Sequence, residues 1–545
     1  MTSSMKCKIL IAMLPKFLCK NIATVFVPPS NISRNHMEFA QSRSSILFSE
    51  WHKSLSKSKS LNSNSDMPNI TICVVTLNSE KWLDAFLDSL CALNYPRKRL
   101  SIHFVDHGST DVTLAKLTRF MSKKGLAFLN VKLDERLNEG YGSGNDFAIR
   151  RAKDELVLVT NVDVEFYVDS LRIIANAALQ DTPSVASWEF RQCPHEHPKY
   201  YDPVTQLSGW ASHACILLRR TAYLEVGGYD KNIFMYGEDV ELSYRLRNNG
   251  WQLRYVPSAV IQHHVDLHDL STRPNQLSGS IAANILLRRR YGSILDRCMG
   301  KLLFFTFKIR EKDPVRKEAI KTAGEIYKKH RLDFGPIKSR WQGVNFRFNG
   351  FNYSLRKEGA TLFHNPSHNS NLPLVRIFTP FQNPLSQAFK DTVTTVLNQT
   401  YDNIEYVIIR ETDEDEGGFF ENLKCAYENR VKYVKPEQVF ISSDDHFKYL
   451  CWLGSGDLLF SDHIELLTTA IESKDSVRAA QSYGWTNSAA NVLSQVVVFQ
   501  SDYFDKNEVP IDAAVIKRKI TKLNSDSSEQ LLCLPKTTSI IQAVI

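Results

Sequence analysis

The chain has 545 residues and a mass of 62.3 kDa, more than one hydrophobic core usually holds, so we expect two or three domains. Hydrophobic residues make up 43% and charged residues 23%, as in ordinary globular proteins. The formal net charge is +8, but residues 1–66 hold nine Lys and Arg against three acids, which leaves the remainder nearly neutral. This balance argues against a broad nucleic-acid surface, and we expect no nucleic-acid partner.

Residues 1–66 form a basic segment that ends in a Ser, Lys and Asn-rich linker at 53–66. The apolar run at 9–18 is too short to cross a bilayer and is interrupted by Pro15. Two interpretations stay open: a disordered tail, or a segment that contacts an anionic membrane. The ten cysteines show no CxxC pair, which favours a reducing compartment and a cytoplasmic location, peripheral at the membrane if the tail binds lipid.

Strands and helices alternate after Pro68. The apolar run 70–77 predicts a buried strand, and the helical spacing of Trp82, Phe86 and Leu90 follows it. Further strands are expected at 100–106 and 155–163, with a glycine-rich turn and a helix between them. This order predicts an α/β fold with a mainly parallel sheet and ligands at the carboxyl ends of its strands.

Oxygen-bearing side chains stand at those strand ends. Asp106 ends one predicted strand, and we expect its carboxylate to project into the crevice. Asn161, Asp163 and Glu165 follow at i, i+2 and i+4, which would set them on one face of an extended chain. Hard divalent cations prefer such ligands, whereas solvated turn acids are the plainer explanation. Two strand ends of this kind favour a site.

An acidic pair, Glu238 and Asp239, opens a helix predicted over 236–250, in which Glu241 can pair with Arg245. Carboxylates at a helix N-terminus gain roughly 0.3–1 kcal/mol from the helix dipole, so the pair needs no function to be explained. The order of "VDHGSTD", "NEGYGSGND", "TNVDVEF", "GGYDKNIFMYGEDVELSYRLRNNGW" and "YVPSAVIQHH" gives it another meaning. From about 70 to 266 the chain resembles the family 2 glycosyltransferases of GT-A fold, especially their rhamnosyltransferase-like members.

The resemblance implies an inverting sugar transfer from a nucleotide-diphosphate sugar, assisted by Mg²⁺ or Mn²⁺. It places Thr76 and Asp106 against the nucleotide, together with Asn161, which replaces the first aspartate of the family's DxD-type motif. Asp163 falls on that motif's metal-binding acid. It also implies that Asp239 takes the proton of the acceptor hydroxyl while Glu238 positions the acceptor. His263 and His264 follow a predicted strand, and we expect His263 to complete the metal shell or to contact the diphosphate.

The sequence divides into a basic tail at 1–66, a catalytic domain at 67–275, a helical linker region at 276–371 and a second domain at 372–545. The second domain resembles a smaller, degenerate copy of the same α/β fold. Arg410 stands where a nucleotide-binding acid would be, and Gly454 and Gly456 replace two acids of the metal motif, leaving Asp457. We expect this copy to bind the acceptor or to form a homo-oligomer rather than to catalyse.

The preferred function is a glycosyltransferase that acts on a saccharide or lipid-linked acceptor in surface polysaccharide or lipopolysaccharide assembly. The alternative is a non-catalytic nucleotide-sugar or glycan-binding protein built from two remnant domains. A nucleotidyltransferase is a third candidate, because related folds also bind nucleotides with acidic residues. Asp106, Asp163 and Asp239, all present in the first copy, favour the transferase.

Overall fold

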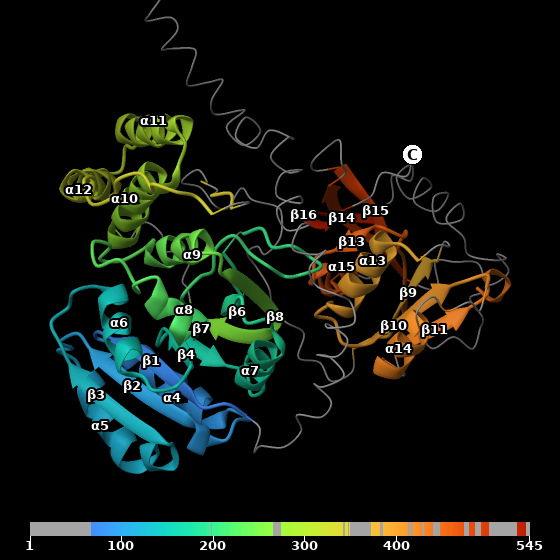
Figure 1. The fold of residues 1–545 in the computed structure, drawn as a ribbon, viewed down its shortest axis with the longest axis horizontal. Helices are drawn as coiled ribbons and strands as arrows, with labels where there is room; N and C mark the ends of the chain where they lie inside the picture. Colours follow the sequence, from blue (N-terminus) through green and yellow to red (C-terminus); the bar gives the residue numbers. More distant parts are fainter. Residues whose placement is uncertain are drawn as a thin grey trace, which may run out of the picture. The chain divides into compact units, whose positions relative to one another are not determined.

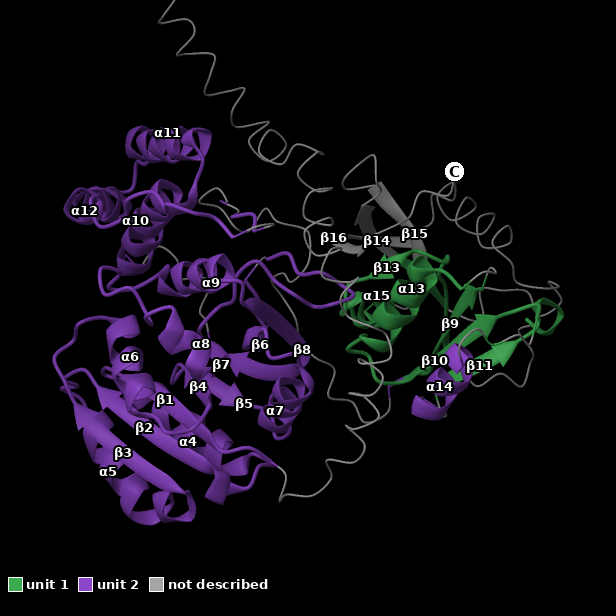
Figure 2. Cartoon of the chain, viewed as in Figure 1, with its two compact units in different colours: residues 1–46, 373–416, 429–545 green, residues 47–372, 417–428 purple. Residues whose placement is uncertain are grey.

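The computed structural model describes residues 67–197, 199–264, 274–341, 344–346, 348, 372–381, 385–412, 415, 418–427, 430–439, 447–473, 479–485, 492–500 and 531–540. The predicted tail at 1–66 lies outside these residues. The chain divides into two compact units (Figure 2). One contains residues 47–372 and 417–428, and the other contains residues 1–46, 373–416 and 429–545. Each unit is described by itself.

The first unit is built on an eight-stranded mixed sheet with the order β3-β2-β1-β4-β7-β6-β8-β5 (Figure 1). Strands β1 to β4 run parallel, while β7 pairs antiparallel with β4 and β6, and β5 pairs antiparallel with β8. The predicted α/β sheet is therefore confirmed, with an antiparallel extension. The strands are β1 (Ile70–Thr76), β2 (Leu100–Asp106), β3 (Asn130–Glu135), β4 (Leu156–Thr160), β5 (Val164–Phe166), β6 (Val185–Cys193), β7 (Cys215–Arg219) and β8 (Gln252–His263).

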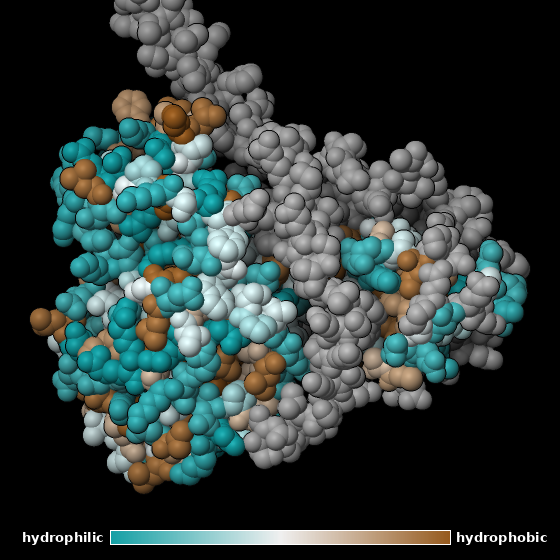
Figure 3. Space-filling model, in the orientation of Figure 1, coloured by the Kyte–Doolittle hydropathy of each residue, from teal (hydrophilic) through white to brown (hydrophobic). Residues whose placement is uncertain are grey.

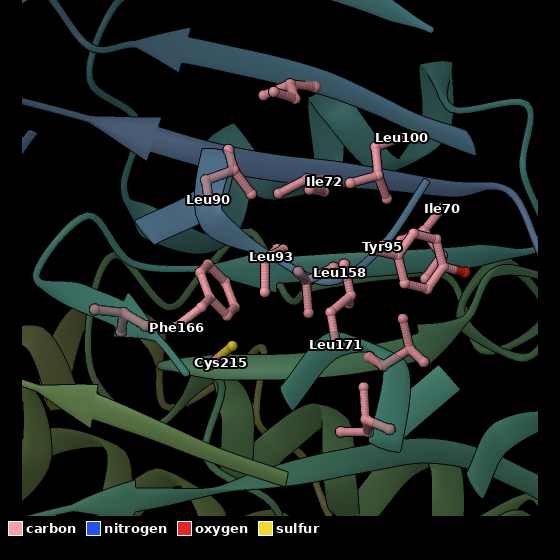
Figure 4. Packing of buried hydrophobic residues seen from close by; sticks show 14 of the residues in the cluster. Ile70, Ile72, Leu90, Leu93, Tyr95, Leu100, Leu158, Phe166, Leu171 and Cys215 are labelled. Carbon is pink, nitrogen blue, oxygen red and sulfur yellow. The ribbon is translucent and has the colours of Figure 1, made fainter. Parts of the chain in front are cut away.

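Helices cover both faces of this sheet. Along β1, Ile70, Ile72 and Val74 face one core and Cys73 faces the other, as the two-residue period of a strand requires. Figure 4 shows the first core, where Ile72 and Leu158 from the sheet meet Leu90 from a covering helix. The helices on this face are α4 (Glu80–Ala92), α5 (Thr113–Lys123) and α7 (Ser170–Gln180); on the other face are α6 (Tyr141–Arg151), α8 (Arg220–Glu225) and α9 (Glu238–Asn248).

Three further helices follow β8 in the first unit: α10 (Pro274–Tyr291), α11 (Ile294–Arg310) and α12 (Pro314–His330). The expected helical spacing of 276–371 is realised in α12, where Ala319 and Ala323 are buried against Ile281 of α10. Short 3-10 turns lie at η1 (Arg97–Arg99) and η2 (Gly125–Ala127). Among the described residues, no helix is both long enough and apolar enough to span a bilayer.

The second unit has its own eight-stranded sheet, with the order β11-β10-β9-β12-β15-β14-β16-β13. This order and every parallel or antiparallel pairing repeat those of the first sheet, strand for strand. The unit is thus a second copy of the α/β fold of the first unit. Its strands are β9 (Val375–Pro380), β10 (Ile404–Ile409), β11 (Val431–Val434), β12 (Tyr449–Trp452), β13 (Leu458–Leu459), β14 (Ala479–Trp485), β15 (Val492–Gln500) and β16 (Leu531–Ile540). Its helices are α13 (Gln387–Leu397), η6 (Pro436–Gln438) and α15 (His463–Glu472), whereas α14 (Phe419–Ala426) lies in the segment 417–428 that is counted with the first unit.

Candidate active site

Thr76 and Asp106 end neighbouring strands in register, and the Thr76 hydroxyl donates to Asp106 Oδ1 at 2.7 Å. Asp106 does not project into an open crevice as we expected, because it is fully buried. Its other contacts come from the following turn: the backbone N–H groups of Gly108 and Ser109 donate to Oδ2 at 3.0 and 2.7 Å, and the Ser109 hydroxyl donates to Oδ1. The carboxylate therefore shapes the loop after β2.

Asn161, Asp163 and Glu165 do not share one face of a single strand. The chain turns after Thr160, and a new strand, β5, begins at Val164. Asn161 and Asp163 lie in the connecting turn, whereas Glu165 lies on β5 and pairs with His264 Nε2 at 2.6 Å. Asn161 Oδ1 is buried and has no hydrogen-bond partner. The turn thus separates Asp163 from Glu165 and leaves an unsatisfied oxygen beside Asp163.

His263 is aimed at Asp163, as the predicted metal role requires. Its Nδ1 lies 2.8 Å from Gln192 Oε1, an atom that can only accept, so Nδ1 carries a proton. The other ring nitrogen, Nε2, lies 3.4 Å from Asp163 Oδ1. Burial acts to raise the pKa of Asp163, but the hydrogen bond and charge of His263 outweigh it and hold that pKa below its usual value.

The glycine-rich turn before α6 brings further groups to this place. Gly140 has a φ of +101°, and a Cβ there would lie 2.1 Å from the Phe234 carbonyl oxygen, so close backbone packing explains the glycine. Tyr141 follows and donates from its hydroxyl to the His213 carbonyl at 2.9 Å. Burial, then the charges of Glu238 and Asp163, raise the pKa of Tyr141, which therefore lies near both carboxylates.

The acidic pair opens α9 as predicted. Gly237 precedes it in a left-handed conformation, with a φ of +101°, and Asp239 Oδ1 accepts from the Val240 backbone N–H at 2.7 Å. Glu238 is buried, and its Oε2 has no hydrogen-bond partner. Burial raises the pKa of both carboxyl groups, and the adjacent charge of Asp239 raises that of Glu238 further. Such a pair is suited to holding and releasing protons near neutral pH.

Helix α9 is held in place by α10. The expected pair of Glu241 with Arg245 is present at 2.5 Å, but Glu241 is buried and has two further partners on α10. Arg290 Nη1 lies 2.6 Å from Glu241 Oε1, and the Tyr291 hydroxyl donates to the same oxygen at 2.8 Å. Leu242 packs against the sheet one position later. The helix that carries Glu238 and Asp239 is thus held to α10 through buried charge.

A buried ion cluster that we did not predict lies beneath the site. Lys199 is fully buried, pairs with Glu189, and lies 3.3 Å from Glu196. Burial alone would lower the pKa of Lys199, but the two carboxylates outweigh it and raise that pKa, so the amine stays charged. Glu196 stands between two histidines in the sequence, and no local pattern marks it as the partner of a buried lysine.

Both halves of the site are tied to this cluster. Glu196 Oε2 accepts from the Gln192 backbone N–H at 3.0 Å, and Gln192 in turn holds His263. Glu189 Oε1 accepts from the Ser212 backbone N–H at 2.8 Å. The next residue is His213, whose carbonyl binds Tyr141 and whose backbone hydrogen bond lowers the pKa of Asp239. The Lys199 cluster therefore supports the metal side and the acidic pair together.

Among the described residues, no group of three or more His, Cys, Asp and Glu side chains is arranged to hold a metal ion. Asp163 and His263 supply two facing ligand atoms, and the buried Asn161 oxygen lies in the same turn. In the second unit, Asp457 precedes β13 as Asp163 precedes β5, but its Oδ2 accepts from the Gly454 backbone N–H at 3.1 Å.

The first unit is similar in sequence to known glycosyltransferases. The sequence model of the family described as Glycosyl transferase family 2 matches residues 71–237 and ends one residue before Glu238. An N-acetylglucosaminyl-diphospho-decaprenol L-rhamnosyltransferase of Mycobacterium tuberculosis is 28% identical over 242 residues, covering 36% of this chain and 76% of that protein. The rhamnosyltransferase WbbL of Escherichia coli is 26% identical over 168 residues, covering 24% and 62%.

Among solved structures, a mannosyltransferase from Pyrobaculum calidifontis in complex with GDP-Man and Mn²⁺ is 15% identical, with a TM-score of 0.36, and covers 55% of this chain and 97% of that one. The match at 71–237 spans the strand ends with Thr76, Asp106 and Asp163. Residues 71–237 are therefore similar to the Glycosyl transferase family 2 sequence model.

Proposed function

We propose that the first unit transfers a sugar from a nucleotide-diphosphate sugar to a hydroxyl of a saccharide or lipid-linked acceptor, with inversion at the anomeric carbon. The observation that carries this proposal is the convergence of two pairs, Asp163 with His263 and Glu238 with Asp239, around Tyr141 in a family 2 domain. Asp163 and His263 can act at the leaving diphosphate, and Glu238 and Asp239 can act at the acceptor hydroxyl.

Asp239 is the proposed general base. It is half-buried at the N-terminus of α9, where it can accept the proton of the attacking hydroxyl. Glu238, with the higher pKa, keeps its proton near neutrality and can donate a hydrogen bond from its unsatisfied Oε2 to an acceptor oxygen. This division follows from two adjacent carboxyl groups that cannot both ionise cheaply.

Asp163 and His263 would hold Mg²⁺ or Mn²⁺. Two ligands at right angles around such an ion lie about 3 Å apart, close to the separation of Nε2 and Oδ1. The ion would supply positive charge to the departing diphosphate, whose oxygens and water would complete its coordination. Thr76 and Asp106 would set the loop after β2 against the nucleotide, with Asn161 offering its free oxygen from the other side.

The relatives suggest the setting. The mycobacterial protein is named for a decaprenol-linked acceptor, which supports a lipid-linked or saccharide acceptor in surface polysaccharide assembly here. We further propose the divisions 67–275, 276–371 and 372–545 as catalytic, helical and degenerate regions. In the region 372–545, Arg410 and the glycines beside Asp457 stand where a catalytic copy would have acidic residues. We therefore assign this region to acceptor binding or homo-oligomer formation.

A panel of nucleotide sugars tests the proposal through release of the nucleotide diphosphate with Mn²⁺, with Mg²⁺ and with a chelator. We expect one donor to be turned over or hydrolysed, and chelation or Asp163→Asn to weaken its binding. The Asp457→Asn variant is the matched control. Binding without metal and without any turnover on the whole panel would favour the alternative of a non-catalytic binding protein.

A further inference from the structure

Helix α11 carries two apolar faces, and only one of them is used inside the protein. Phe304 and Phe307 pack against the core shared by α10 and α12. Gly324 of α12 approaches the Phe304 ring so closely that a Cβ there would lie 3.1 Å from it. Gly300 is buried on the same inner face, against Arg288. These contacts fix which way the helix faces.

The outer face is apolar and open to solvent. Ile294, Leu295, Leu302, Phe305 and Ile309 recur at helical spacing along it, and their exposed fractions are 75%, 77%, 41%, 59% and 65%. Figure 3 shows brown side chains gathered where Figure 1 labels α11. Single exposed apolar residues are ordinary, but a row of five along one 17-residue helix is a continuous surface.

Basic side chains border this row. Arg297, Lys301 and Lys308 are spaced by four and seven residues and form the adjoining row of the helix. Residues 294–317 hold seven Lys and Arg against three Asp and Glu. An apolar stripe with a basic edge is the pattern of helices that lie in the interface of an anionic bilayer.

We propose that the outer face of α11 binds the surface of an anionic lipid bilayer, with its apolar row in the acyl boundary and its basic row at the headgroups. A second copy of the chain is a poorer partner, because each copy would bring the same cations to the contact. A bilayer supplies both the apolar volume and the negative charge. The proposal does not rest on the proposed transferase activity.

A bound α11 would also orient the acidic pair. Helix α10 joins α11 and holds α9 through Arg290 and Glu241. It also packs on the start of α9, where a Cβ on Gly237 would lie 2.3 Å from that of Ala283. The three helices and the N-terminus of α9 therefore keep a fixed geometry, so a surface that holds α11 holds Glu238 and Asp239 at a set distance from the headgroups.

Co-sedimentation of the full chain with vesicles tests this, using phosphatidylglycerol mixed into phosphatidylcholine, without donor. We expect Leu302→Ser/Phe305→Ser to lower the partition coefficient at least tenfold. Lys301→Gln/Lys308→Gln should lower it about thirtyfold at low salt and little at high salt. The control is Leu126→Ser/Leu129→Ser, which removes two exposed leucines, one in η2 and one just after it, and should leave vesicle binding unchanged.

Near-equal vesicle binding by wild type and both α11 variants would overturn the proposal. Residues 1–66 are the same in these proteins, so any difference in binding between them is due to α11. A shift from dimer to monomer in Leu302→Ser/Phe305→Ser by analytical ultracentrifugation, with vesicle binding unchanged, would assign the face to a second copy instead. Loss of vesicle binding by the α11 variants, with release of the nucleotide diphosphate unchanged, would support α11 as the lipid-binding surface. This result does not depend on whether the proposed transferase activity is correct.

Discussion

Replacing Lys199 with Met should destabilise the protein, because it removes the cation of the buried ion cluster that supports the site. The substitution keeps most of the apolar stem but removes the amine, which lies over the rings of Trp210 and Tyr255, and leaves Glu189 and Glu196 without a cation. Removing one partner of a buried ion pair costs about 3–5 kcal/mol of unfolding free energy. The surface pair of Lys116 with Asp84 gives the matched control, since Lys116→Met should cost about 0–1 kcal/mol.

The cost of Lys199→Met should depend on pH with a definite sign. Burial already raises the pKa of Glu189 to about 7, and loss of the amine raises it further. A protonated Glu189 relieves the repulsion, so the cost should be larger at pH 8 than at pH 5. Denaturant unfolding of Lys199→Met, Lys116→Met and wild type at both values measures this. Equal and small costs for the two variants at pH 8 would refute the buried cluster.

Three more predictions concern the site. Burial raises the pKa of Asp239 to about 6, so transfer at saturating substrate should fall as the pH drops through that value and the base gains a proton; a flat profile from pH 5 to 8 would contradict this. Asp457→Asn should leave turnover within about twofold, because Gly454 and Gly456 stand where the first unit's metal motif would have acids and the Asp457 carboxylate accepts from the Gly454 backbone N–H; abolished turnover in a folded variant would place chemistry in the second unit. Gly237→Ala should lower the unfolding midpoint, because its φ is +101° and its Cβ would meet that of Ala283; an unchanged midpoint would show that α10 yields freely.

The sequence predicted the elements whose signals are local. The buried strand at 70–77, the helix with Phe86 and Leu90, and α9 behind Gly237 all follow from hydrophobic period and turn residues, and the structure has each of them. The turn between Asn161 and Val164 was missed because a strand that ends and restarts keeps the same composition. The burial of Asp106 was missed because its partners come from the turn that it organises.

The Lys199 cluster could not be predicted from sequence patterns. Its three members stand at 189, 196 and 199, on a strand and a long loop, and only the folded sheet brings them under Ser212 and Gln192. Most lysines are solvated surface residues, and the complete burial of Lys199 depends on the two carboxylates that the fold brings against it. The sequence predicted that the second domain repeats the α/β fold, and the structure adds the strand order and the direction of each pairing.

Transfer by an Asp239→Asn variant tests most directly whether the first unit is a glycosyltransferase with its base at the head of α9. The amide is nearly isosteric and can still accept from the Val240 backbone N–H, so fold and donor binding should persist. Loss of a general base typically lowers the rate about 10²–10⁴-fold, and we predict a fall of that size with the donor dissociation constant within about twofold of wild type. Full transfer by a folded Asp239→Asn variant would contradict the assignment.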